Sequence, residues 1–95
     1  MIHIEHENNE KNGRFIIFYE NKEAGEMTYT WAGNDKFIID HTLVSPEFGG
    51  KGLAKKLILE SIDYARANSL KIIPLCPYAK SVFEKNKEFS DVFYS

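Results

Sequence analysis

The sequence has a single cysteine, and this scarcity excludes two classes of small protein. One thiol cannot form an internal disulfide framework, and it cannot build a zinc site that needs several cysteines. A chain of 95 residues without such staples must be held together by a hydrophobic core. Its residues are 43% apolar and 14% aromatic, which is enough for one core, so we expect residues 1–95 to form a single domain.

An excess of positive charge is also missing, because 12 Lys and Arg residues stand against 14 Asp and Glu residues and the net charge is -2. Nucleic-acid-binding domains usually carry a basic surface, so we expect no nucleic-acid partner. No apolar run approaches the ~20 residues of a membrane-spanning helix, and the N-terminus lacks the apolar segment of a signal peptide. We therefore expect a cytoplasmic protein without a membrane partner.

The first half of the chain has the two-residue periodicity of β-strands. Four segments show it: residues 1–6, 14–20, 25–31 and 36–44. In the third segment Met27, Tyr29 and Trp31 alternate with polar residues, which predicts that these three side chains face the core. In the fourth segment, alternation puts Phe37, Ile39, His41 and Leu43 on one face and Ile38, Asp40, Thr42 and Val44 on the other. Tight turns between the segments predict an antiparallel meander.

After Pro46 the periodicity becomes helical. Apolar residues at positions 53, 57, 58, 61, 62 and 65 predict a helix over residues 53–68. A short strand is expected at 71–75, and a second helix at 77–85. Residues 89–94 either add an edge strand or pack down on the core. The order predicts a mixed α+β class, in which an antiparallel β-meander is followed by α-β-α.

A glycine-rich loop, Phe48 to Gly52, joins the last meander strand to the first helix. Glycines let a ligand approach the backbone, and the N–H groups at a helix N-terminus lack intrahelical partners. Such a site suits a phosphate or pyrophosphate, with Lys51, Lys55 and Lys56 at its rim. Neither the Walker motif nor the dinucleotide fingerprint fits this loop, and a plain connector is the alternative.

The stretch VSPEFGGKGLA, residues 44–54, resembles the acetyl-CoA motif of the GNAT (GCN5-related N-acetyltransferase) family, in which V-x-P precedes [QR]-x-x-G-x-[GA] and a helix. Gly50 and Gly52 match the motif glycines. Glu47 stands where the family usually has Gln or Arg, and Gly49 stands where Arg is frequent. The resemblance implies that the pyrophosphate of acetyl-CoA lies on residues 49–54. The cofactor-binding residues that it implies are Val44, Gly49, Gly50, Lys51, Gly52, Leu53, Ala54, Cys76 and Tyr78.

The stretch CPYAKSVFEK, residues 76–85, resembles the next motif of the family, N-x-x-A-x-x-[LV]-[YF]-E-K. Ala79 and Val82 match the motif. Cys76 stands at the Asn position, and Phe83 stands where a frequent catalytic Tyr serves as general acid toward the CoA thiolate. Phenylalanine cannot donate that proton, so the general acid is unassigned.

The resemblance covers about residues 14–85 and lacks the helical pair that normally follows the first strand of the family. It implies a truncated GNAT-like fold of a short subfamily whose substrates are largely unassigned. The implied function is transfer of an acetyl group from acetyl-CoA to a primary amine of unknown identity, without a metal. A non-catalytic acyl-CoA-binding or regulatory module is the alternative, favoured by Glu47 and Phe83. Without the helical pair an apolar sheet face could be exposed, so we expect a monomer or a weak homodimer.

His41 and Cys76 are the candidate catalytic residues. The ordinary pKa of histidine suits a general base that deprotonates an ammonium substrate, while the alternative is a packed histidine on an apolar face. Asp40, expected on the opposite face, would not orient it. Cys76 precedes Pro77 and is expected at a helix N-cap, where thiol pKa values fall. It either attacks the thioester, lines the pantetheine tunnel, or fills space in the core.

Two further groups of side chains have simpler interpretations. Tyr78 and Tyr94 are the candidates for the missing general acid. His3 and His6 face opposite sides of a strand, so we expect no metal site there.

Overall fold

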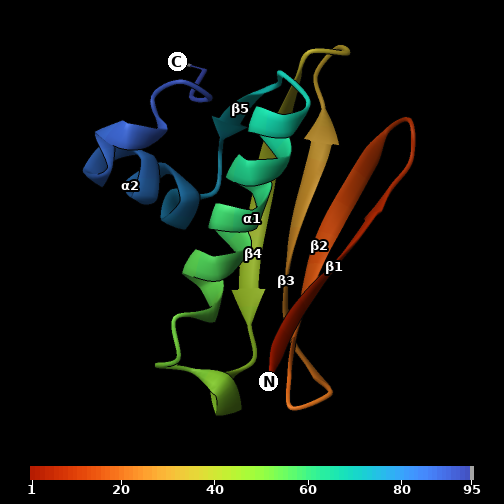
Figure 1. Cartoon of the computed structure of the whole chain (residues 1–95), viewed down its shortest axis with the longest axis vertical. Helices are drawn as coiled ribbons and strands as arrows, with labels where there is room; N and C mark the ends of the chain where they lie inside the picture. Colours follow the sequence, from red (N-terminus) through yellow and green to blue (C-terminus); the bar gives the residue numbers. More distant parts are fainter. Residues whose placement is uncertain (95) are drawn as a thin grey trace.

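The computed structural model, which describes residues 1–94, contains one five-stranded sheet and two α-helices (Figure 1). The strands are β1 (Ile2–Asn8), β2 (Asn12–Tyr19), β3 (Lys22–Trp31), β4 (Lys36–Val44) and β5 (Lys71–Pro74). Their order in the sheet is β1-β2-β3-β4-β5, with antiparallel pairing up to β4 and parallel pairing of β4 with β5. The helices are α1 (Leu53–Ala67), which joins β4 to β5, and α2 (Pro77–Lys85). The predicted α+β class and order of elements are confirmed.

The first hairpin is longer than the sequence pattern predicts. The stretch from Glu7 to Gly13 was expected to be a turn, but Glu7 pairs with Arg14 and Asn8 pairs with Gly13. The turn is confined to residues 9–11, because the side-chain oxygen of Asn9 accepts hydrogen bonds from the backbone N–H groups of residues 11 and 12. Such an Asx turn closes a hairpin within a few residues.

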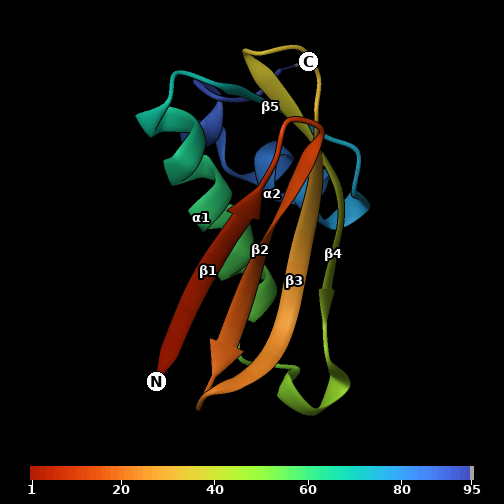
Figure 2. The same ribbon diagram turned by 90° about the vertical axis from the view of Figure 1, so that its right-hand side faces the viewer.

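Both helices pack against the same face of the sheet (Figure 2). The helical stripe predicted at 53, 57, 58, 61, 62 and 65 is buried in α1 at each of these positions. It meets the inward side chains of β2, β3 and β4, which include Phe15, Met27, Tyr29, Phe37 and Ile39. Ala79, Val82 and Phe83 of α2 complete the same core. None of the described helices is long and apolar enough to cross a membrane.

The opposite face of the sheet, called here the open face, carries no helix of residues 1–94 (Figure 2). The expectation of an apolar face at this place is wrong, because polar side chains dominate it. Arg14, Glu26 and Thr28 lie on this face and bond to one another or to neighbouring strands. Leu43 is its large exposed apolar residue, at 61% exposure. A polar face can remain in contact with water without a covering partner.

A bulge at Asp40 reverses the alternation of β4. Thr28 of β3 pairs with His41, whereas the next residue, Tyr29, pairs with Ile39, so that Asp40 is left between them. An extra residue in one strand shifts every later side chain to the other face. The predicted face assignment is therefore wrong beyond Ile39. His41 and Leu43 lie on the open face, while Thr42 and Val44 face the helices.

Strand β5 leaves β4 just before the bulge. The parallel pairing ends at Ile39 with Pro74, and the Ile39 carbonyl then accepts hydrogen bonds from the N–H groups of Leu75 (3.2 Å) and Cys76 (3.1 Å). The chain turns there into α2. Residues 40–44 of β4 consequently have no strand partner on this side within the described chain. Two sheet neighbours that diverge leave backbone donors and acceptors free for a ligand.

The C-terminal stretch mostly packs down on the core. Phe89 and Val92 are buried, and Phe93 forms an isolated bridge with Ile72 of β5. Residues 89–94 were expected either to add an edge strand or to pack on the core. They pack on the core and form a single β-bridge, not an edge strand.

Candidate functional site

The glycine loop after β4 has a backbone that favours glycine at two positions. Gly50 and Gly52 have φ values of +78° and +72°, in the left-handed region that residues with a Cβ rarely adopt. A Cβ built at either position would meet nothing within 4 Å, so both glycines border open space. Gly49 has an ordinary φ of -64°. At Gly50 and Gly52 the backbone of the loop is therefore exposed to solvent without a covering side chain.

Helix α1 begins directly at this loop. Gly52 is its N-cap residue, and no side chain caps the helix or adds an acidic group to its first turn. The first N–H groups of a helix have no intrahelical partners, and the helix dipole makes this end partly positive. An anion can therefore be bound here by backbone donors alone.

A cavity of about 140 Å³ lies between this loop and α2. Its lining residues are Val44, Phe48, Gly49, Gly50, Lys51, Gly52, Leu53, Ala54, Lys55 and Tyr78. All of the predicted cofactor-binding residues except Cys76 are among them. The Lys51 ammonium lies 4.8 Å from the centre of the Tyr19 ring, which keeps a positive charge at the edge of the loop.

Cys76 is the N-cap residue of α2, followed by Pro77, as the sequence predicts. The residue is 5% exposed, and its Sγ lies 3.7 Å from Thr42 Oγ1. Burial raises the pKa of the thiol, but hydrogen bonds from the Ala79 N–H, the Thr42 hydroxyl and the Tyr78 N–H outweigh it and lower the pKa below its ordinary value. The site stabilises a thiolate beside the free edge of β4.

His41 lies on the open face, and its side chain is 58% exposed. The interpretation as a packed histidine is therefore wrong. Its Nδ1 lies 3.2 Å from Thr28 Oγ1, and its Nε2 lies 4.0 Å from a carboxylate oxygen of Glu26. Asp40 lies on the same face, contrary to the expectation, and accepts a hydrogen bond of 2.7 Å from the Thr30 hydroxyl.

The two candidate catalytic residues lie on opposite sides of β4. Cys76 contacts Thr42 on the helix side, while His41 contacts Thr28 on the open face. They therefore do not form a nucleophile–base pair. The alternation of the strand could not reveal this separation, because only the bulge at Asp40 brings His41 to the open face.

Of the remaining tyrosine and histidine candidates, only Tyr78 lies beside the loop cavity. Tyr78 is 39% exposed beside the loop cavity, and burial, together with the charge of Cys76, raises the pKa of its phenol. Tyr94 is not among the residues that line the cavity, and its ring lies 5.1 Å from the Lys36 ammonium. His3 stacks on Phe18, whereas His6 stacks on Phe15 on the other side of the hairpin. Among residues 1–94, no three His, Cys, Asp or Glu side chains are grouped to hold a metal ion.

Comparison with known proteins identifies the family. The family described as GCN5-related N-acetyl-transferase matches residues 14–92, and the chain belongs to this family. The comparison with curated proteins returned no match.

Solved structures agree with this assignment. A GCN5-like protein from Staphylococcus aureus is 40% identical, with a TM-score of 0.72 over 96% of this chain and 88% of that one. A ribosomal-protein-alanine N-acetyltransferase from Brucella melitensis is 21% identical, with a TM-score of 0.70 over 81% of this chain and 62% of that one. A protein from Bacillus anthracis, solved in complex with acetyl coenzyme A, is 18% identical with a TM-score of 0.63, over 82% of this chain and 47% of that one. The last two show a shared fold. The chain is thus an acetyltransferase by family.

Proposed function

We propose that the protein transfers an acetyl group from acetyl-CoA to a primary amine. The observation that carries the proposal is the cavity at the N-terminus of α1, where Gly50 and Gly52 expose backbone donors that no side chain caps. The pyrophosphate of acetyl-CoA binds there. Lys51 and Lys55 add positive charge at the rim.

The free edge of β4 supports the rest of the binding mode. Residues 40–44 have no strand partner on the β5 side, so their N–H and C=O groups are available to the two amide groups of pantetheine. The thioester then lies near the point where β5 leaves β4, beside Thr42 and Cys76. Acetyl-CoA bound in this way fills the gap between the two strands, and Val44 and Tyr78 border its path.

The acetyl group passes directly to the amine in this proposal. His41 takes a proton from the ammonium of the substrate, the amine nitrogen attacks the thioester carbonyl carbon, and the C–S bond breaks as the nitrogen loses its second proton to water. The CoA thiolate takes a proton from the Tyr78 phenol or from water. The raised pKa of Tyr78 keeps its phenol protonated at neutral pH, so that it has a proton to give. Much of the rate comes from the positioning of the two reactants.

Cys76 lines the tunnel in this scheme. The groups around its Sγ are the Thr42 hydroxyl and backbone N–H groups, which stabilise a thiolate but cannot accept its proton. A cysteine nucleophile usually works with an adjacent general base, and His41 lies across the strand. Direct transfer to the amine therefore fits the site better than an acetyl-cysteine intermediate.

A non-catalytic acyl-CoA-binding module is the second candidate. Phe83 occupies the position that the family motif gives to a tyrosine, and it is 5% exposed within the core. No hydroxyl can act from that position. This candidate keeps the acetyl-CoA site and removes the chemistry.

A paired experiment tests the proposal. In the first part, acetyl-CoA is titrated into labelled protein, and we expect the amide resonances of residues 49–54 to shift. In the second part, release of CoA is measured with a panel of primary amines. Binding with amine-dependent CoA release supports the enzyme, and binding without release from any amine supports the second candidate. Unchanged resonances at millimolar acetyl-CoA would overturn both.

A further inference from the structure

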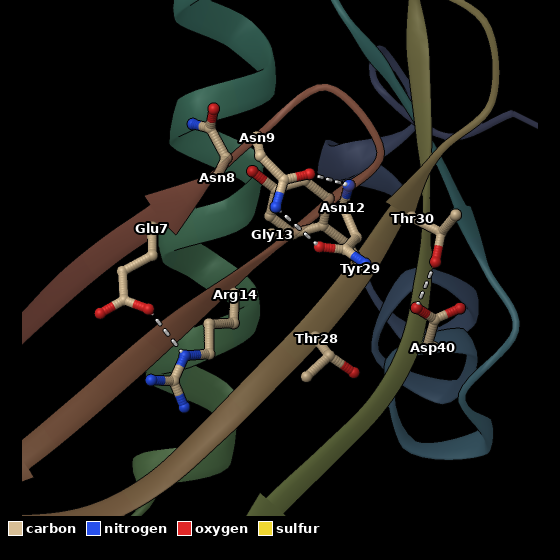
Figure 3. A pocket seen from close by; sticks show the side chains of 10 residues that line it. All are labelled: Glu7, Asn8, Asn9, Asn12, Gly13, Arg14, Thr28, Tyr29, Thr30 and Asp40. Atoms are coloured by element: carbon tan, nitrogen blue, oxygen red, sulfur yellow. Dashed lines mark hydrogen bonds and ion pairs between the residues drawn. The ribbon is translucent and has the colours of Figure 1, made fainter.

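A second cavity, of about 310 Å³, lies on the open face of the sheet (Figure 3). We call it the acceptor hollow. Its lining includes Glu7, Arg14, Thr28, Thr30 and Asp40, together with the asparagines at the end of the first hairpin. It shares no residue with the loop cavity at α1. The residues labelled in Figure 3 come from β1, β2, β3 and β4 and, with Asn9, from the turn between β1 and β2, so the hollow crosses the meander.

Local packing gives the hollow its depth and its form. A Cβ at Gly13 would lie 2.5 Å from the Tyr29 ring, so only glycine lets β2 pass this close to Tyr29. Asn9 holds the turn through the bonds to residues 11 and 12. Thr30 donates to Asp40, which orients that carboxylate over the strand. The hollow is therefore a formed feature of the folded hairpins.

Negatively charged side chains outnumber positively charged ones in and beside the hollow. The guanidinium of Arg14 donates to both Glu7 and Glu26, at 2.9 Å in each case. Asp40 has no cationic partner among the described residues, and its one side-chain hydrogen bond comes from the neutral Thr30. Three carboxylates thus face one cation, and the carboxylate of Asp40 is free to pair with a cationic ligand.

The hollow also begins where the proposed reaction takes place. Asp40 is the bulged residue of β4, and His41, the proposed base, follows it on the same face. Directly before the bulge, Ile39 marks the end of the pairing with β5, so the gap between the strands opens at this point. A ligand held at Asp40 on one side would face a thioester held in the gap.

We infer that the acceptor hollow binds the amine that receives the acetyl group, and that this amine is small and hydrophilic. The inference rests on the proposed function. Its ammonium pairs with Asp40, and its hydroxyl or amide groups bond to the Thr28 and Thr30 hydroxyls and the asparagine side chains. A volume of about 310 Å³ is small for a ligand site, and most of the residues that line it carry polar side chains, which suits an amine with hydroxyl groups. The substrate class is therefore a hydroxylated primary amine of the amino-sugar kind.

The test uses D-glucosamine as the probe, with spermidine and phenethylamine as comparisons. Glucosamine alone should shift the amide resonances of residues 12–14, 28–30 and 40. The variant Asp40→Asn keeps the shape and removes the charge, and it should lower kcat/KM for glucosamine about tenfold or more while the Kd for acetyl-CoA stays unchanged. Glu60→Gln, which removes a carboxylate from the exposed side of α1, is the control and should change neither value.

Three results would overturn the inference and leave the proposed function standing. One is normal acetyl-CoA binding and amine-dependent CoA release with no glucosamine shift in the hollow. A second is a higher kcat/KM for spermidine or phenethylamine than for glucosamine, since either would contradict the hydroxylated class. An equal loss of acetyl-CoA binding in Asp40→Asn would also contradict the inference, because the aspartate would then support the cofactor edge of β4. Failure of acetyl-CoA to shift residues 49–54 would instead overturn the proposed function itself.

Discussion

Cys76 receives opposing influences from its surroundings, and their balance can be measured. Burial raises the pKa of the thiol, while the donors at the start of α2 and the Thr42 hydroxyl lower it more. We expect iodoacetamide alkylation to reach its half-maximal rate at a pH below the ordinary pKa of cysteine. The variant Thr42→Val removes one donor and should move that midpoint upward. At an acetyl-CoA concentration of about 100 Kd, alkylation should slow about 100-fold, because only ~1% of the sites are then free.

Intact-mass measurement separates the possible roles of this thiol. We expect no stable acetyl adduct on the wild-type protein after incubation with acetyl-CoA, and retained transferase activity in Cys76→Ser. An adduct that hydroxylamine removes and that Cys76→Ser lacks would establish the nucleophile instead. A thiol that reacts only in denaturant would assign Cys76 to core packing.

His41 is exposed on the open face, so its replacement should affect activity and not folding. His41→Ala should change the free energy of unfolding by less than ~0.5 kcal/mol, as is usual for surface substitutions. If His41 is the base, kcat/KM should fall by about 10²- to 10⁴-fold, with the Kd for acetyl-CoA unchanged. The measurements are chemical denaturation and a pH–rate profile, in which the acidic limb is lost in the variant. Unchanged activity would exclude His41 from the mechanism.

Site residues that follow one another in the chain can be predicted from the sequence. Site residues whose position depends on the bulge in β4 cannot. The residues 49–54 lie next to one another in the chain, so their identity alone brings them to one helix N-terminus. Asp40 and His41 differ, because their faces depend on an extra residue in β4 that leaves no mark in the alternation. The hollow that begins at Asp40 had no signal in the sequence for the same reason.

Among the elements, the loop before α1 allows a controlled test. Gly50→Ala and Gly52→Ala each place a Cβ on a left-handed residue, at a cost of about 1–2 kcal/mol. Each Cβ would also enter the space proposed for the pyrophosphate, so we expect the Kd for acetyl-CoA to rise at least about tenfold. Gly33→Ala is the matched control, because Gly33 has a φ of +81° in the β3–β4 turn, away from the cavity.

The control distinguishes strain from ligand contact. Gly33→Ala should lower the melting temperature by about as much as the two loop variants, by the order of 4–8 °C per kcal/mol, with the Kd for acetyl-CoA unchanged. Calorimetry and NMR titration provide the two readouts. Normal acetyl-CoA binding by both loop variants would remove the backbone of the loop from the site.

The bounds of elements whose apolar residues repeat regularly could be predicted from the sequence. The bounds of elements without a buried face could not. Helix α1 was expected at 53–68 and lies at Leu53–Ala67, because its stripe must meet the sheet and few other registers bury it. The far end of the first hairpin extends beyond the core, so both faces of Glu7 and Asn8 meet water. Polar residues there look the same in a strand and in a turn.

For the whole molecule, one partly buried histidine links stability to pH. Burial lowers the pKa of His6 below its ordinary value of 6.5. Burial also raises the pKa of Tyr29 far above its usual range, so this phenol keeps its proton, and its oxygen lies at a hydrogen-bond distance of 2.6 Å from His6 Nε2. The unfolded chain therefore takes up a proton on His6 at a higher pH than the folded protein does. The contribution of neutral His6 to the free energy of unfolding is complete above about pH 6.5, and it is lost as the pH falls toward the pKa of His6 in the folded protein.

A thermal-melting series tests this linkage. The melting temperature should be lower at pH 5.5 than at pH 7.5, and the difference should shrink in His6→Gln. His3→Gln is the control, because His3 lies on the other side of the hairpin and stacks on Phe18. An equal pH dependence in the wild type and in His6→Gln would contradict the role of His6.

The point where β5 separates from β4 also sets the length of the acyl-CoA that β4 can hold between its phosphates and its thioester. The Ile39 carbonyl accepts from two successive N–H groups, so the point where β5 departs cannot slide along the strand. Residues 40–44 span ~17 Å from this point to the end of β4, at ~3.4 Å per residue. In the proposed binding mode, a donor reacts only if its acyl carbon lies about one such span from its phosphates. Inserting two residues in this segment would preserve every side-chain face and lengthen it by ~7 Å, which would change the thioester length that the enzyme accepts.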